Sequence, residues 1–124
     1  MTRARFQIVK EFGFEAAHMF AHKPAGHENT RVHGHSFKAA VALAGEPDPV
    51  TGCVVDFEQL TAAVNAVRAK LDHRMLNDLP GLGTPSLENL ARWIAAELAP
   101  TFPSLTRVTV GRPSLGETCH YEPA

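Results

Sequence analysis

The chain lacks three features that would assign it to a common class of protein. Its 12 Lys and Arg nearly balance its 13 Asp and Glu, giving a formal net charge of −1, so no basic field is available to hold nucleic acid or an anionic membrane. No apolar run approaches the length of a membrane span. Its two cysteines, Cys53 and Cys119, form neither a CxxC motif nor a disulfide framework, and we interpret them as packing residues.

The start of the chain also lacks the apolar segment of a signal peptide. Together with the sparse cysteine usage, this predicts a cytoplasmic protein that binds neither nucleic acid nor membrane. Repeats, linkers and low-complexity segments are missing as well. A length of 124 residues therefore suits one compact domain over residues 1–124.

Alternating apolar residues predict two strands early in the chain, over residues 5–14 and 32–45. Residues 15–31 contain Pro24 and Gly26 and are interpreted as a long loop. Loops of this length inside a compact domain are usually functional or disordered.

Apolar residues at spacings of three and four predict two amphipathic helices. The first follows Asp56 as its N-cap and extends to Leu71. The second follows a cap at Thr84 or Ser86, with Pro85 in its first turn. Two further strands are predicted over 105–111 and 117–122, so the element order is β-β-α-α-β-β. This order predicts an α+β fold in which an antiparallel β-sheet carries two helices on one face.

Five of the seven histidines fall between positions 18 and 35. Because a strand turns alternate side chains to one face, His33 and His35 should point together across Gly34, and His18 follows the first predicted strand. Three imidazoles are the protein half of a catalytic zinc site whose fourth position is open for water or substrate. The alternative is a set of polar loop or core histidines, which this spacing disfavours.

Asp72 and His73 stand together at the end of the first predicted helix. An Asp beside a His can fix its tautomer and raise its basicity, as a general acid or base requires. Adjacent residues do not face each other on a regular helix, so this role needs non-helical geometry. Otherwise His73 is a solvated residue favoured by the helix dipole.

Five more residues are weaker candidates. Glu88, near the start of the second helix, either complements the helix dipole or faces a pocket. Glu117 and Thr118 form one candidate binding site. Glu117 is either a surface acid or a carboxylate that pairs with a guanidine-like heterocycle edge through two parallel hydrogen bonds, and Thr118 is a candidate binding residue beside it. His22 and His27 are additional histidines in the predicted loop, with less support as ligands.

These motifs, in this order, resemble the 6-pyruvoyl-tetrahydropterin synthase and 6-carboxy-tetrahydropterin synthase family over nearly the whole chain. The similarity is greatest to the bacterial 6-carboxy branch. Each motif alone is weak, but the ordered set is highly specific. The motifs are Phe14-Glu15-Ala16-Ala17-His18, His33-Gly34-His35-Ser36-Phe37, Gly52-Cys53-Val54-Val55-Asp56-Phe57, Leu71-Asp72-His73-Arg74-Met75-Leu76-Asn77-Asp78 and Pro85-Ser86-Leu87-Glu88-Asn89.

The resemblance implies a tunnelling fold (T-fold), in which trimers form a barrel of strands and two trimers stack into a homohexamer with active sites between subunits. It implies Zn²⁺ on His18, His33 and His35, and a relay pair made of Asp72 and His73. It also places Glu88 near the pterin pocket. The implied substrate is the small molecule 7,8-dihydroneopterin triphosphate. In the 6-carboxy branch the products are 6-carboxy-5,6,7,8-tetrahydropterin, acetaldehyde and triphosphate, early in queuosine and deazapurine biosynthesis.

Two positions depart from the family pattern. The synthase branches usually carry a cysteine four residues before His-Gly-His, where this chain has Asn29, and a side-chain-cleaving branch has glutamate at the position of Thr30. A neutral amide cannot accept a proton at pH 7, so Asn29 can only orient substrate or water. Glu28 is the nearest carboxylate that could replace the missing base.

The second departure is Arg112, which stands where the family usually shows Glu-Thr after Val-x-Val-x. Glu117 and Thr118 come five residues later. Either a longer loop returns Glu117 to the same pocket, which we favour, or Arg112 has changed the pocket to prefer a carboxylate or phosphate.

Three functions remain open. The first is a zinc-dependent pterin lyase of the 6-carboxy-tetrahydropterin synthase type, with His73 as its general base. The second is a paralogue with an altered pterin substrate or product. The third is a non-catalytic pterin-binding protein, which the missing thiol makes a real alternative.

Overall fold

A computed structural model describes residues 5–123. Residues 1–4, which bear on the expected absence of a signal peptide, lie outside this range. The described chain forms strands, helices and short 3₁₀ turns in the following order: β1 (Phe6–His18), η1 (Glu28–Thr30), β2 (His33–Gly45), α1 (Phe57–Leu71), β3 (Arg74–Met75), η2 (Leu76–Asp78), α2 (Leu87–Leu98), β4 (Leu105–Arg112), η3 (Pro113–Leu115) and β5 (Glu117–Tyr121).

The sheet has the strand order β3-β1-β2-β4-β5. The four predicted strands pair antiparallel, which confirms the expected α+β fold. The fifth strand, β3, was not predicted. It pairs parallel with β1 at Ala16 and Ala17, so the sheet is mixed. Two residues are too few to show the period-2 pattern from which strands are recognised.

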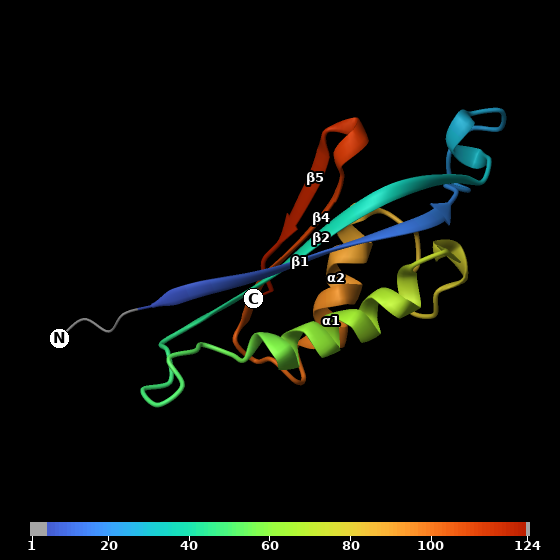
Figure 1. Cartoon of the computed structure of the whole chain (residues 1–124). Helices are drawn as coiled ribbons and strands as arrows, with labels where there is room; N and C mark the ends of the chain where they lie inside the picture. The colour runs from blue at the N-terminus through green and yellow to red at the C-terminus, as the bar shows by residue number, and fades with distance from the viewer. Residues whose placement is uncertain (1–4, 124) are drawn as a thin grey trace.

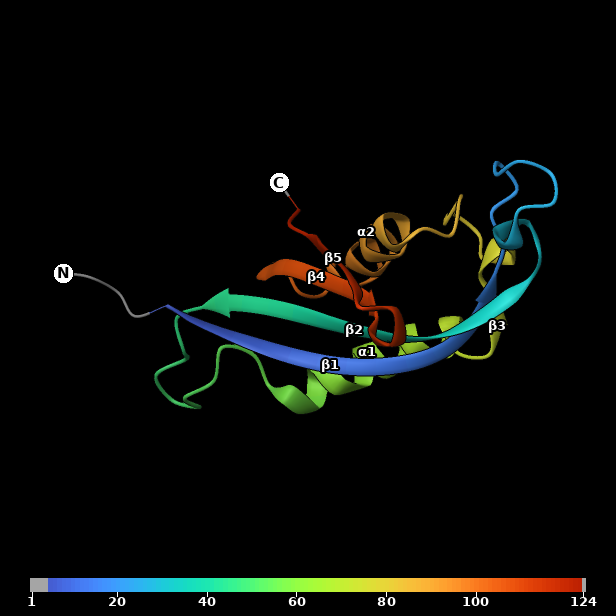
Figure 2. The same ribbon diagram turned by 90° about the horizontal axis from the view of Figure 1, so that it is seen from above.

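Both helices lie on the same face of the sheet, as predicted (Figures 1 and 2). Along β1 the side chains of Phe12 and Phe14 are buried, whereas Glu11 and Glu15 are exposed. The apolar core lies between this face and the helices. Its fully buried side chains include Val41, Leu43, Leu60, Val64, Leu71, Leu76, Leu90, Ile94, Val108 and Val110.

Side-chain caps fix where the helices begin. Asp56 Oδ1 accepts a hydrogen bond from the N–H of Glu58 at 2.9 Å, and Ser86 Oγ accepts one from the N–H of Asn89 at 3.1 Å. Ser86 is therefore the cap of α2, as one of the two predicted alternatives had it. Pro85 precedes the cap, so its predicted place in the first helical turn is wrong. Neither helix within residues 5–123 is long and apolar enough to cross a membrane.

The end of β1 differs from the prediction in a way that positions the site. The strand continues through His18 instead of ending at residue 14, because Glu15 to His18 remain paired with β2. The connecting segment is correspondingly shorter, from 19 to 32. This segment and the end of α1 lie at the same end of the molecule (Figure 1).

Candidate metal centre

The sheet register brings three histidines together on the face that carries the helices. His18 is paired with His33, and Ala16 is paired with His35. Directly opposed residues of antiparallel strands point to the same side, so all three imidazoles converge. Their candidate ligand nitrogens lie within 4.8 Å of one another. The spacing of three imidazoles around one point is what a metal ion requires.

Backbone carbonyls determine which ring nitrogen of two histidines is free. His18 Nδ1 lies 3.1 Å from the carbonyl oxygen of Pro85, and His33 Nδ1 lies 2.8 Å from that of Arg31. A carbonyl only accepts, so each Nδ1 carries the proton and donates it. The lone pair of Nε2 is then available in both rings, which is the arrangement that orients histidine ligands in metal sites.

His18 Nε2 is buried and has no hydrogen-bond partner among the described residues. A buried polar atom without a partner costs about 1–3 kcal/mol. A metal ion held by the three imidazoles removes this penalty, so the residues present fit a metal. Three nitrogen donors are typical of catalytic zinc sites.

Burial favours the neutral form of two of the three histidines. Burial lowers the pKa of His18 from its ordinary 6.5 to about 4, with further lowering by the charges of His33, His35 and Arg112, against the opposing carbonyl of Pro85. The pKa of His35 is also lowered, by burial and then by Arg112. Metal ligands must be deprotonated, and these shifts favour the neutral, metal-binding form of His18 and His35.

A cavity of about 470 Å³, called the metal cavity below, opens beside the candidate metal centre, with His33 and His35 in its wall. The predicted residues that also line it are Glu28, Asn29, Glu88, Arg112 and Glu117. His22 lines it too, whereas the His27 ring caps η1 by accepting the N–H of Asn29. Thr118 is not among the lining residues.

Both candidates for the heterocycle anchor reach this cavity. Arg112 ends β4 and Glu117 begins β5, and they pair across the two strands. Gly116 allows this turn, because its φ of 66° lies in the region that glycine adopts at least cost. Arg112 Nη2 lies 3.0 Å from Glu117 Oε1. Glu117 and Arg112 therefore line the same pocket, so the two alternatives considered for the anchor position are not mutually exclusive.

The Asp72–His73 pair adopts the non-helical geometry that its proposed role requires. Asp72 is the C-cap of α1, and His73 follows with a φ of 59°, which is uncommon outside glycine. His73 Nδ1 then lies 2.9 Å from Asp72 Oδ2. The N–H of Glu15, and then the His73 ring, hold the pKa of the Asp72 carboxyl below its ordinary value.

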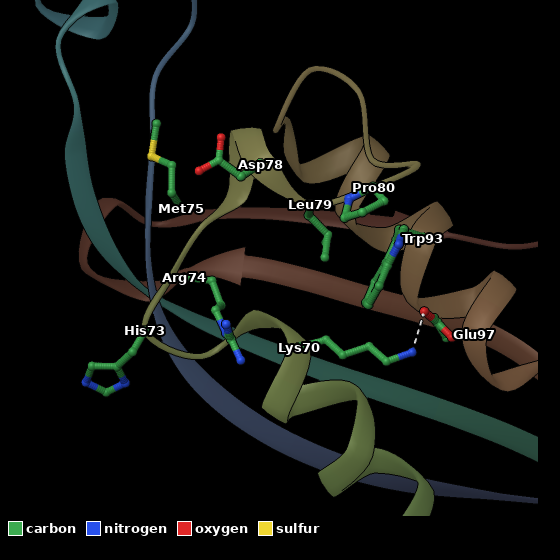
Figure 3. A pocket seen from close by; sticks show the side chains of 9 residues that line it. All are labelled: Lys70, His73, Arg74, Met75, Asp78, Leu79, Pro80, Trp93 and Glu97. Atoms are coloured by element: carbon green, nitrogen blue, oxygen red, sulfur yellow. Dashed lines mark hydrogen bonds and ion pairs between the residues drawn. The ribbon is translucent and has the colours of Figure 1, made fainter.

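His73 does not line the metal cavity in the single chain. Its side chain is 78% exposed and borders a second cavity of about 620 Å³ together with Lys70, Arg74 and Trp93. Figure 3 shows this second cavity, where the His73 ring points away from Trp93 and Lys70. It also borders a groove beside Glu15 and Ser36, on the opposite face of β1 from His18.

Several supporting residues were missed by sequence reasoning. Asn77 accepts the N–H of Met19 at 2.9 Å and donates to its carbonyl at 3.0 Å, which fixes the chain directly after His18. Asn77 belongs to a recognised motif, so a signal for it existed. The carbonyls of Arg31 and Pro85 have no sequence signal, because every residue has one.

Comparisons with known proteins agree with this geometry. Residues 7–124 match the family model described as 6-pyruvoyl tetrahydropterin synthase. The chain is 44% identical over 98 residues to a 6-carboxy-5,6,7,8-tetrahydropterin synthase of Synechocystis sp., covering 73% of each chain. It is 34% identical over 97 residues to a dihydroneopterin monophosphate aldolase of Pyrococcus furiosus, covering 78% of each. The solved 6-pyruvoyl tetrahydropterin synthase of Caenorhabditis elegans superimposes with a TM-score of 0.85 at 25% identity, covering 100% of both chains.

Proposed function

Because this chain belongs to the 6-pyruvoyl tetrahydropterin synthase family, we propose that it is a zinc-dependent pterin lyase. The proposed reaction converts 7,8-dihydroneopterin triphosphate and one water molecule to 6-carboxy-5,6,7,8-tetrahydropterin, acetaldehyde and triphosphate, in queuosine and deazapurine biosynthesis. The buried, unpartnered Nε2 of His18, facing His33 and His35, is the observation that carries the proposal.

The Nε2 atoms of His18 and His33, with one ring nitrogen of His35, are the proposed zinc ligands. When bound there, Zn²⁺ supplies Lewis acidity that polarises the side-chain oxygens of the pterin. The protein residues fix the ligand tautomers through Pro85 and Arg31. They also leave a cavity on one side of the site for substrate.

We assign proton transfer to His73, held by Asp72. Asn29 lines the cavity where the family usually has a thiol, and an amide cannot accept a proton. Asn29 therefore orients substrate or water in this proposal. Glu28 also lines the cavity and is the alternative base.

His73 does not line the metal cavity of its own chain, so we propose that it acts in the active site of a neighbouring subunit within a homohexamer. One feature of β1 supports assembly. β2 covers one edge of β1, while β3 covers the other edge only at Ala16 and Ala17. Phe6 and Val9 on β1 are 53% and 44% exposed. A long, partly apolar strand edge of this kind is suited to pairing with another chain.

The pterin ring is proposed to bind at Glu117, near Glu88. The Glu117 carboxylate accepts from the amino group and adjacent ring N–H, in the bidentate manner of paired N–H donors. Thr118, predicted as a binding residue, follows Glu117 on β5 and stays a predicted contact of the pterin.

The proposal is tested by incubating zinc-loaded protein with 7,8-dihydroneopterin triphosphate and identifying the products by mass spectrometry. We expect 6-carboxy-5,6,7,8-tetrahydropterin and acetaldehyde. His33→Gln should lose both zinc and turnover. His120→Gln, on β5 and outside the cavity, should retain both. Substrate that binds but survives intact contradicts the lyase and supports a pterin-binding protein.

A second candidate is a paralogue that cleaves the pterin side chain at another bond. Asn29 in place of the usual cysteine favours it, as does the similarity to an archaeal aldolase. The same assay separates the two, because cleavage at another bond releases a different aldehyde and a different pterin.

A further inference from the structure

The Arg112–Glu117 ion pair lies in the wall of the metal cavity. The side chains of these residues are 17% and 50% exposed. Their contact of 3.0 Å uses one nitrogen of the guanidinium, Nη2. Arg112 Nε is buried and has no hydrogen-bond partner in the described part of the chain. A guanidinium has five N–H donors in a fixed fork, so Arg112 has donors left over for a ligand.

The backbone holds this pair in place. Arg112 and Glu117 are opposite each other at the end of the β4–β5 hairpin. The turn between them is closed by the N–H of Gly116, which donates to the carbonyl of Pro113 at 3.1 Å. The two groups are therefore presented side by side before any ligand arrives, and such preorganisation lowers the entropic cost of binding.

The pair offers a defined pattern of hydrogen bonds. A carboxylate only accepts and a guanidinium only donates. The complementary ligand edge carries two N–H donors next to a carbonyl acceptor. The 2-amino group, ring N–H and 4-oxo group of a pterin form this edge. Glu117 alone cannot recognise the oxo group, since it can only accept.

Building on the proposed function, we propose that Arg112 and Glu117 form a specificity-determining pair that selects a 2-amino-4-oxo heterocycle over a 2,4-diamino one. Glu117 binds the N–H groups, and Arg112 donates to the 4-oxo oxygen. A 4-amino group would point its own donors at the guanidinium and leave both unpaired. A hydrogen bond to a charged group is worth a factor of about 10 to 150 in affinity, which is the discrimination assigned to Arg112.

The test measures dissociation constants of zinc-loaded protein for 7,8-dihydroneopterin and its 2,4-diamino analogue by calorimetry. We expect the wild type to prefer the 4-oxo ligand by tenfold or more. Arg112→Met should weaken binding of the 4-oxo ligand by at least tenfold and leave the 4-amino ligand unchanged, so the preference disappears. Arg107→Met makes the same substitution on β4 at a different cavity and should preserve it. Glu117→Gln should weaken both ligands, because both carry the 2-amino group.

The outcomes separate this inference from the proposed function. If the wild type binds neither ligand, the pterin pocket itself is wrong. If the wild type binds the 4-oxo ligand but Arg112→Met keeps the preference, or weakens both ligands equally, the role of Arg112 is overturned. If Arg112→Met loses affinity for inorganic triphosphate but keeps the preference for the 4-oxo ligand, Arg112 binds a phosphate group instead. That result also overturns its role in selecting the heterocycle. Zinc content confirms an intact site in each variant, and Arg112→Gln replaces Arg112→Met if the latter does not fold.

Discussion

At the scale of single residues, His18 combines a polar side chain with a position in the apolar core. Among the described residues it is the only polar or charged residue that is buried, with none of its surface exposed. Pro85 satisfies one ring nitrogen, and the other faces two more imidazoles. The residue thus places an unpaired ring nitrogen in the core at a cost in free energy, which a bound metal ion would offset.

We predict that the metal-free protein loses stability as the pH falls from about 7 to about 4. The pKa of His18 is about 4 in the folded chain against an ordinary 6.5, so the unfolded chain binds the proton first. Stability rises with pH wherever the unfolded state binds more protons. At roughly 1.4 kcal/mol per pKa unit, the loss is on the order of 3 kcal/mol, and it develops as pH falls through this window.

Urea unfolding of chelator-treated protein across this pH range measures the effect. His18→Gln should flatten the pH dependence, although the lowered pKa of His35 acts in the same direction and leaves some of it. His120→Gln serves as the control and should keep the full dependence. An identical dependence in His18→Gln and wild type would contradict the assignment.

Site residues could be predicted from the sequence where a local rule applied. The alternation of side chains along a strand predicted that His33 and His35 point the same way, and the motif that ends at His18 supplied the third histidine. The Asp72–His73 contact depends on a positive φ at His73, which no local pattern specifies for histidine. The competition between Arg112 and Glu117 could not be resolved either, because both turned out to share one pocket.

At the scale of elements, the β4–β5 hairpin depends on a close approach at Gly111. A Cβ at this position would lie 2.8 Å from the carbonyl oxygen of Glu117 and 3.1 Å from Thr118 Oγ1. We expect Gly111→Ala to destabilise the fold by about 1–3 kcal/mol through overpacking, and to displace Glu117 from Arg112.

Gly13→Ala is the matched control for this prediction. It also adds a methyl group to a strand, but its Cβ would lie 3.5 Å from the carbonyl oxygen of Phe37, an ordinary contact. Denaturant unfolding should show a clearly larger loss for Gly111→Ala than for Gly13→Ala. Equal losses would mean that the close approach at Gly111 is not what limits substitution there.

The helices were the best-predicted elements, because residues 57–71 and 87–98 repeat apolar side chains at spacings of three and four over several turns. The end of β1 was not predicted, since Glu15-Ala16-Ala17-His18 shows no alternation of large apolar residues. Its conformation comes from pairing with β2, a long-range interaction. β3 also depends on a long-range interaction, because its two residues, Arg74 and Met75, pair with β1.

At the scale of the whole molecule, the distribution of the site predicts complementation between subunits. His33→Gln removes a proposed zinc ligand, and His73→Ala removes the proposed general base, whose loss alone costs about 10²–10⁴ in rate. Each variant should therefore be nearly inactive. If His73 serves a neighbour's metal centre, a mixed oligomer contains sites in which both halves are intact. Random mixing of equal amounts should restore roughly a quarter of the wild-type activity.

Activity of co-expressed and co-purified variants measures this recovery. A mixture of His33→Gln with His35→Gln is the control, because both changes damage the same half of the site and no combination repairs it. If the His33→Gln and His73→Ala mixture stays as inactive as its components, the site is complete within one chain and the assembly proposed here is wrong.

The candidate metal centre and the Arg112–Glu117 pair lie on different parts of the sheet, which has an evolutionary consequence. The three histidines lie on the β1–β2 ladder, whereas Arg112 and Glu117 lie at the end of a hairpin on the far side of β2. If both proposals hold, substitutions in the turn from Pro113 to Gly116 would change which heterocycle is accepted without moving the three histidines of the candidate metal centre. A fold divided in this way can diversify its substrates by editing one short turn, without rebuilding the chemistry that acts on them.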